Sequence, residues 1–180
     1  CGEYLRHIKK CDFISYNVVH PTMQGEIDVV GISLTKRAIY VCEVAVHTGG
    51  LQYVTNRRPD NFNRFNSKFK KSIAYAKTYF PNYKNIVPML WSPIVRVASE
   101  TAKYNTHSEL MRHKWEIQKA HKLGLQIIVN EDFLSALADL REVAFNTSSQ
   151  FYGSVMRIFQ IETKLQRHLS NMAKRKSRKS

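Results

Sequence analysis

The chain has 180 residues, of which 43% are hydrophobic, 23% charged and 11% aromatic, a composition typical of a globular domain and not of a fibrous or low-complexity protein. No stretch approaches the roughly 20 consecutive apolar residues that a membrane helix needs. Charged side chains also interrupt the N-terminal residues where a signal peptide would be apolar. We therefore expect a cytoplasmic protein that neither spans a membrane nor is secreted. Its three cysteines, none in a Cys-x-x-Cys motif, are expected to be reduced.

The net charge predicts a polyanionic partner. Lys and Arg number 28 against 14 Asp and Glu, which gives a formal charge of +14. Such an excess disfavours a compact chain through self-repulsion unless an anion binds it regularly. Nucleic acid is the partner we expect, ahead of an anionic membrane or an acidic protein. Because the last eight residues hold five cations and no acid, we expect one domain over 1–172 and a disordered basic tail over 173–180.

The first half of the chain predicts a short helix followed by three strands. The helix covers residues 3–9, and runs rich in β-branched and aromatic side chains follow at 13–19, 27–32 and 38–46. Short turns separate these runs, so we expect an antiparallel meander. Asp60 then caps a helix that extends to about Phe80. Its apolar residues recur at helical spacing and are expected to face the core: Phe62, Phe65, Phe69, Ile73 and Ala76.

The second half alternates strands and helices. Residues 86–91 predict a fourth strand, irregular or at an edge because of Pro88. A helix over 106–123 and a strand over 125–129 follow, and two further helices precede the tail. The resulting order, α-β-β-β-α-β-α-β-α-α, predicts an α/β domain with a mixed sheet flanked by helices and with extra C-terminal helices.

Three carboxylates in the second and third strands carry the chemistry that we expect. Glu26 and Asp28 lie two residues apart and so leave the same face of a strand, whereas Glu43 lies inside the apolar run YVCEVAV. A buried carboxylate costs several kcal/mol unless it is paired or binds a cation. If the two strands pair through the turn at 35–37, Asp28 and Glu43 approach each other. Mg²⁺ or Mn²⁺ then relieves their repulsion, and Mg²⁺ is commonly held by one or two carboxylates together with water and a phosphate oxygen.

The sequences GEIDVV and YVCEVA, with the element order around them, resemble those of the PD-(D/E)XK nuclease superfamily, in particular members related to Holliday-junction resolvases. The resemblance extends over about half the chain, from Tyr4 to Trp91. It implies a restriction-endonuclease-like α-β-β-β-α-β core. It also implies that Asp28, Glu43 and the Val44 carbonyl bind the metal, and that Glu3 orients a water molecule.

One departure from the family pattern concerns the residue that polarises the attacking water. The family has a lysine where this chain has Ala45. Strand alternation points His47 to the same side as Glu43 and Ala45, so His47 is one substitute. Other candidates in the loop and helix that follow are Gln52, Lys68 and Lys71.

Each of these residues also has a simpler interpretation. Asp28 and Glu43 could form a structural ion pair with a cation on a neighbouring element. Glu26 and Glu3 could be solvated residues of a strand and a helix, and His47 could be a polar residue leaving its strand.

Cations cluster after the proposed site, where residues 57–84 contain eight basic side chains and one acidic one. We expect them, together with the tail, to neutralise nucleic-acid phosphates without reading bases. The residues assigned to this contact are Arg57, Arg58, Arg64, Lys68, Lys71, Lys174, Arg175 and Lys176.

The sequence thus predicts a Mg²⁺- or Mn²⁺-dependent endonuclease that acts on duplex or branched DNA, or on RNA. It would be associated with the nucleoid in a bacterial host and could act as a homodimer. The first alternative is a nuclease fold that has lost its activity and only binds nucleic acid. The second is a basic protein that binds an acidic partner through its tail and last amphipathic helix.

Overall fold

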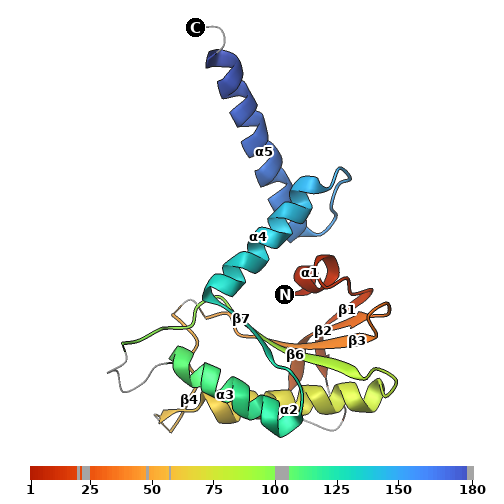
Figure 1. Cartoon of the computed structure of the whole chain (residues 1–180), viewed down its shortest axis with the longest axis vertical. Coiled ribbons are helices and arrows are strands. Elements are labelled where there is room, and N and C mark those ends of the chain that lie inside the picture. Colours follow the sequence, from red (N-terminus) through yellow and green to blue (C-terminus); the bar gives the residue numbers. More distant parts are fainter. Residues whose placement is uncertain (20, 22–24, 48, 57, 100–105, 178–180) are drawn as a thin grey trace. The chain divides into compact units, whose positions relative to one another are not determined.

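A computed structural model describes residues 1–19, 21, 25–47, 49–56, 58–99 and 106–177 (Figure 1). The chain divides into two compact units, Cys1–Leu134 and Ser135–Ser180, which are described separately below. No helix among the described segments is both long and apolar enough to cross a membrane. The cysteines Cys1, Cys11 and Cys42 are free.

The first unit is built on a five-stranded mixed sheet in the order β1-β2-β3-β6-β7. Its strands are β1 (Phe13–Val19), β2 (Glu26–Ser33), β3 (Ala38–Val44), β6 (Asn85–Ser92) and β7 (Gln126–Val129). β1, β2 and β3 pair antiparallel as a meander, whereas β3 with β6 and β6 with β7 pair parallel. The predicted α/β class with a mixed sheet is therefore confirmed. A short β4–β5 hairpin (Val54–Thr55 and Arg58–Pro59) was not predicted.

Helices flank both faces of this sheet (Figure 1). α1 (Gly2–His7) lies on one face, and α2 (Asn61–Tyr79) and α3 (Thr106–His121) lie on the other. α2 forms the crossover between the parallel strands β3 and β6. Its predicted apolar stripe faces the core as expected, because Phe65, Phe69, Ile73 and Ala76 are buried and Phe62 packs beside them.

One local prediction in the first unit was wrong, and another was confirmed only in part. β6 is not an edge strand, since it lies between β3 and β7 with Pro88 opposite Val41. β7 pairs only with Met89–Ser92, so Pro88 precedes the doubly paired part of β6, where a missing amide need not remove a ladder hydrogen bond. Asp60 occupies the N-cap position of α2 but makes no capping hydrogen bond, because its carboxylate accepts from the Thr55 hydroxyl and the Asn63 side chain instead.

The second unit contains α4 (Asn130–Asn146) from Ser135 onward and the whole of α5 (Ser154–Ser177). The fully buried Gln160 organises their connection: its amide donates to the Thr147 and Ser149 carbonyls, and its oxygen accepts from Phe151 N and Arg157 Nη1.

Arg141 of α4 contacts two side chains of α5. Arg141 pairs with Glu162 at 3.2 Å and lies over the Phe159 ring. Along α5, apolar side chains at roughly heptad spacing are exposed: Val155, Ile158, Ile161, Leu165, Leu169 and Met172. The boundary predicted between residues 172 and 173 falls inside α5, and the single domain and disordered tail stay predictions.

Candidate functional site

The antiparallel register of β2 and β3 brings Asp28 and Glu43 together. Val29 is the partner of Cys42, so continuing the register by one residue sets Asp28 opposite Glu43. Two residues further along the strands, the paired Val30 and Val41 pack in the core cluster that includes Ala76 of α2. Because side chains two residues apart share a face, Asp28 and Glu43 lie on the side of the sheet that α2 covers.

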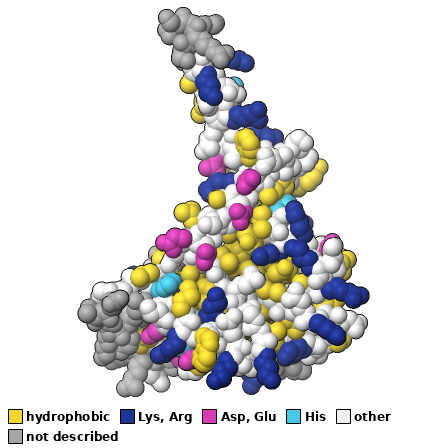
Figure 2. Space-filling model, viewed as in Figure 1, with side chains coloured by type: hydrophobic (Ala, Val, Ile, Leu, Met, Phe, Trp, Pro, Cys, Tyr) yellow, Lys and Arg dark blue, Asp and Glu magenta, His cyan; other side chains and the backbone are white. Residues whose placement is uncertain are grey.

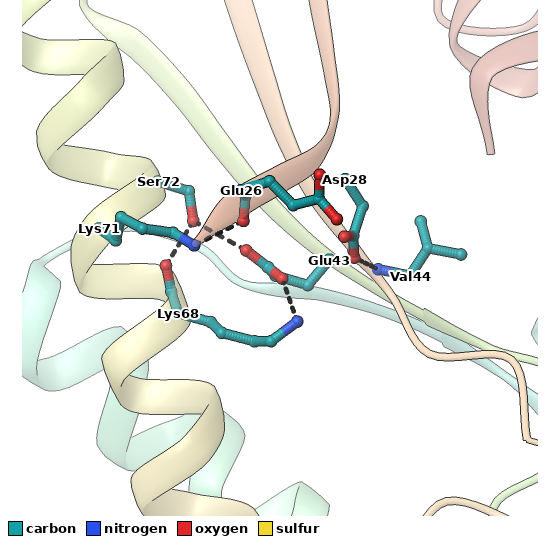
Figure 3. A network of polar contacts seen from close by, with 7 residues as sticks. All are labelled: Glu26, Asp28, Glu43, Val44, Lys68, Lys71 and Ser72. Carbon is teal, nitrogen blue, oxygen red and sulfur yellow. Dashed lines mark hydrogen bonds and ion pairs between the residues drawn. The ribbon is translucent and has the colours of Figure 1, made fainter. Parts of the chain in front are cut away.

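Glu43 is only 1% exposed and contacts two side chains of α2 (Figure 3). Lys68 Nζ donates to Glu43 Oε2 at 2.8 Å and forms an ion pair with it. The Ser72 hydroxyl is 3.4 Å from Glu43 Oε1 and 2.7 Å from the Lys68 carbonyl. Since a hydroxyl donates one proton, the shorter bond takes it, and Lys68 is the main partner of the carboxylate.

The ionisation of this pair follows from burial and charge. Burial raises the pKa of Glu43 above its ordinary value, and the charge of Asp28 acts in the same direction, whereas Lys68 opposes both. Burial tends to lower the pKa of Lys68, but attraction and the hydrogen bond to Glu43 outweigh burial, so the Lys68 pKa is raised. Lys68 is therefore a protonated donor at neutral pH and does not act as a base there.

Asp28 is held in place by the backbone of β3. Its Oδ2 accepts a hydrogen bond of 2.6 Å from Val44 N, which orients the carboxylate beside Glu43. The structure thus shows Val44 as a donor to Asp28, and the predicted use of its carbonyl as a metal ligand stays a prediction.

Lys71 joins α2 to the beginning of β2. Its side chain is buried, and Nζ donates to the Glu26 carbonyl oxygen at 2.5 Å. The Glu26 carboxylate extends along the strand toward Asp28 in Figure 3. This contact fixes the strand that carries Asp28 against the helix that carries Lys68, and the contact of Lys71 with nucleic acid stays a prediction.

The other predicted catalytic residues are placed elsewhere. Glu3 forms an i,i+4 pair with His7 inside α1, at 3.2 Å. His47 is exposed beyond the end of β3, and its ring lies 5.9 Å from that of Tyr53 in an edge-on contact. Ala45 is buried in the core cluster with Phe65. Among the residues that the structure describes, neither Glu3 nor His47 forms a hydrogen bond or ion pair with Asp28 or Glu43.

Of the predicted nucleic-acid contacts, Arg64 is exposed on α2, one turn before Lys68. Lys174 and Arg175 are exposed on the last turns of α5. Arg57 and the side chains of Arg58 and Lys176 lie outside the described part of the chain.

Ser72 is the one member of the network that sequence reasoning missed. It lies one turn after Lys68 among apolar residues of α2, and it is completely buried. A small polar residue at i+4 from a candidate lysine, on the buried side of a helix, is the signal that could have identified it.

Asp28 and Glu43 carry oxygen donors of the type that a hard divalent cation prefers. Within the described residues no group of three or more His, Cys, Asp and Glu could hold a metal ion. Mg²⁺, however, is commonly held by one or two carboxylates with water and phosphate completing its octahedron. Asp28 and Glu43 provide two such carboxylates. A cation at Glu43 would share the carboxylate with the Lys68 ammonium or displace it from Oε2.

No protein-family model, curated protein or solved structure matches the chain. The resemblance to PD-(D/E)XK nucleases therefore rests on its motif residues and element order alone.

Proposed function

We propose that the protein is a Mg²⁺- or Mn²⁺-dependent phosphodiesterase that cleaves DNA on a restriction-endonuclease-like version of the α/β fold. The observation that carries this proposal is the position of Lys68. Its ammonium lies 2.8 Å from Glu43 Oε2, beside the carboxylate pair, where the chain lacks the lysine of the family motif. A helix thus supplies the cation that β3 does not.

The element order supports the proposal. α1, the β1–β2–β3 meander, α2 and the parallel strand β6 follow one another as the α-β-β-β-α-β core requires, with only the β4–β5 hairpin inserted. The two carboxylates lie on the central strands β2 and β3, next to the crossover helix.

The residues have separate roles in the proposed reaction. Asp28 and Glu43 would hold the cation, which when bound lowers the pKa of a water molecule and stabilises charge on phosphoryl oxygens. Lys68, protonated, donates a hydrogen bond toward the attacking oxygen or the phosphate and stabilises developing negative charge. His47, the other substitute that strand alternation offers, is exposed and its ring contacts Tyr53.

Substrate is positioned by charge. Arg64 is exposed one helical turn before Lys68 and can neutralise a phosphate next to the scissile bond. Backbone contacts of this kind orient a strand without specifying its sequence.

The test compares cleavage of labelled duplex, single-stranded and branched DNA, and of RNA, with Mg²⁺, Mn²⁺ or EDTA. We expect cutting of at least one DNA substrate that EDTA abolishes. Asp28→Asn, Glu43→Gln and Lys68→Met should each lower the rate by about 100-fold or more. Lys70→Met is the matched control, because Lys70 is an exposed lysine of the same helix, and it should retain the rate.

Folding must be separated from catalysis, since Lys68→Met leaves a buried carboxylate without its partner. Lys68→Arg keeps the charge, and circular dichroism of every variant verifies the fold. Metal-independent binding without cutting, unchanged in the Asp28 and Glu43 variants, would replace the enzyme by a nuclease fold that only binds nucleic acid. Loss of all partner binding on removal of 170–180 would instead favour a basic protein that binds an acidic partner.

A further inference from the structure

The outer face of α3 presents an aromatic side chain that the fold does not use. Trp115 is 62% exposed, and Met111, one turn earlier, is 37% exposed. The buried residues of α3, Leu110, His113 and Ile117, lie on the opposite side of the helix. Trp115 and Met111 thus form a small exposed apolar surface, and tryptophan is enriched where proteins contact their partners.

Cations surround this tryptophan. Lys119 Nζ lies 5.1 Å from the centroid of the Trp115 ring. Arg112 is exposed at a spacing of three residues from Trp115, which places it on the same face. Lys122 is exposed directly after the last residue of α3. Met111, Arg112, Trp115, Lys119 and Lys122 are called the α3 platform below. Glu116 lies to the side of the platform and pairs with the buried His113 at 3.2 Å.

The positive charge continues from α3 onto α2. His121 Nε2 lies 3.2 Å from Asn66 Oδ1. Burial lowers the pKa of His121, and the nearby charges of Lys77 and Lys70 lower it further. These two lysines lie on a different side of α2 from Lys68 and Glu43. Figure 2 shows Lys and Arg side chains along the lower side of the molecule, where α2 and α3 lie.

We infer that the α3 platform binds single-stranded nucleic acid, with Trp115 stacking on an unpaired base and the surrounding cations contacting its phosphates. A flat aromatic ring beside lysines and an arginine complements a base and its backbone, and stacking is tolerant of base identity. A duplex offers its bases for such stacking only at ends and branches. Membrane insertion requires a broad apolar face, whereas the platform has only Met111 and Trp115.

This inference goes beyond the hydrolytic function and does not depend on it. Binding at the platform needs neither Asp28 nor a divalent cation. The test therefore uses full-length Asp28→Asn protein in EDTA, so that cleavage plays no part.

The fluorescence of Trp115 reports directly on binding at the platform. The second tryptophan, Trp91, is 2% exposed in the core and serves as an internal reference. Titration with oligo(dT) should quench the exposed tryptophan fluorescence, and anisotropy of a labelled oligonucleotide gives the affinity. Trp115→Ala should weaken binding by about tenfold or more and abolish the quenching. Tyr152→Ala is the matched control, because Tyr152 is 99% exposed on the other unit, and it should leave the affinity unchanged.

The cations are tested in the same assay. Lys119→Ala should weaken binding and reduce the slope of affinity against salt concentration, whereas Arg6→Ala, an exposed cation of α1, should leave the slope unchanged. Bound phosphates should raise the pKa of His121, measured by NMR titration, because they offset Lys70 and Lys77.

Several results would overturn the inference. Unchanged oligo(dT) affinity in Trp115→Ala would remove the stacking contact. Equal affinity for inorganic polyphosphate would show that the platform binds by charge alone, without a stacking contact to a base. Duplex DNA bound as tightly and with the same dependence on Trp115 would remove the preference for single strands. Binding to anionic lipid vesicles but not to oligo(dT) would assign the platform to a membrane surface.

Discussion

Lys68 determines whether Glu43 can remain ionised inside the protein. The carboxylate is almost completely buried, and Lys68 is the cation bonded to it. Removing one partner of such a pair leaves a buried charge without compensation. Lys68→Met should therefore lower the free energy of unfolding by about 2 kcal/mol at pH 7, measured by urea denaturation.

The double variant Lys68→Met/Glu43→Gln tests the cause of that loss. Replacing the carboxylate by an amide removes the unpaired charge, so the double variant should recover most of the lost stability. Mg²⁺ should also stabilise Lys68→Met more than the wild-type protein, because the carboxylates are then free of the competing ammonium. Simple additivity of the two single variants would show that the pair is not coupled.

The burial of Glu43 also makes stability depend on pH. Its pKa in the folded protein is raised above the ordinary value of 4.5. Between the ordinary and the raised pKa, Glu43 is protonated in more of the folded than of the unfolded molecules. The contribution of Glu43 to the unfolding free energy is therefore largest below pH 4.5 and is lost as pH rises through the pKa of the folded state. The difference in unfolding free energy between wild type and Glu43→Gln, measured from pH 4 to pH 8, should show this loss. A difference that grows in favour of the wild type over that range would contradict it.

For single residues, the sequence allowed the carboxylates Asp28 and Glu43 to be predicted, but it did not determine which cation lies beside them. Asp28 and Glu43 follow from strand alternation and the position of one turn, which are local properties. The choice of Lys68 over His47, Gln52 or Lys71 depends on how α2 is rotated against the sheet. That rotation is set by how Phe65, Phe69 and Ile73 pack, a tertiary property that spacing alone does not determine.

The contact of α1 with the sheet depends on Gly31 in β2. A Cβ at this position would lie 2.8 Å from Leu5 Cδ1 and 3.1 Å from Cys11 Sγ, both in buried residues. Gly31→Ala should displace α1 and lower stability by about 1–3 kcal/mol in urea denaturation. Gly124→Ala is the control, since no heavy atom lies within 4 Å of its Cβ position. Equal stability of both variants would show that α1 can move without cost.

The connection between α4 and α5 depends on the hydrogen bonds of Gln160. Gln160→Leu would remove the hydrogen bonds of Gln160 to the partly buried Thr147 and Ser149 carbonyls and the Phe151 amide, at a cost of about 1–3 kcal/mol. Hydrogen exchange at the Phe151 amide should become faster. Gln166→Leu, at an exposed position of α5, should not change it. Unchanged exchange in Gln160→Leu would assign the order of this connection to other contacts.

Most elements could be predicted because their patterns are local. The meander and α2 follow from alternation and a stripe at helical spacing. The place of Pro88 in the sheet could not be predicted, because the hydrogen bond that a proline costs a strand depends on where the neighbouring strand begins. The missing capping bond of Asp60 could not be predicted either, because the side chains of Thr55 and Asn63 compete for its carboxylate. The β4–β5 hairpin has only two residues in each strand, too short for alternation to be recognised.

Over the whole molecule, the net charge of +14 opposes folding through repulsion. Salt screens this repulsion, with a Debye length of about 10 Å at 0.1 M. The melting temperature should therefore rise between about 0.05 and 0.5 M NaCl, while affinity for any nucleic acid falls over the same range. Calorimetry and a binding titration at matched salt concentrations measure the two trends. A melting temperature that falls with salt would show that favourable ion pairs outweigh the repulsion.

The network around Glu43 also has a consequence for the order of folding. All of its members lie between Glu26 and Ser72, and its contacts between elements join residues 16 to 45 positions apart. Loops of this length close with a modest loss of chain entropy. The pairing of β6 with β7, by contrast, must wait until α3 has been synthesised. The residues of the candidate centre therefore leave the ribosome before α3 and β7 do, and the contacts described for the network involve no side chain after Ser72.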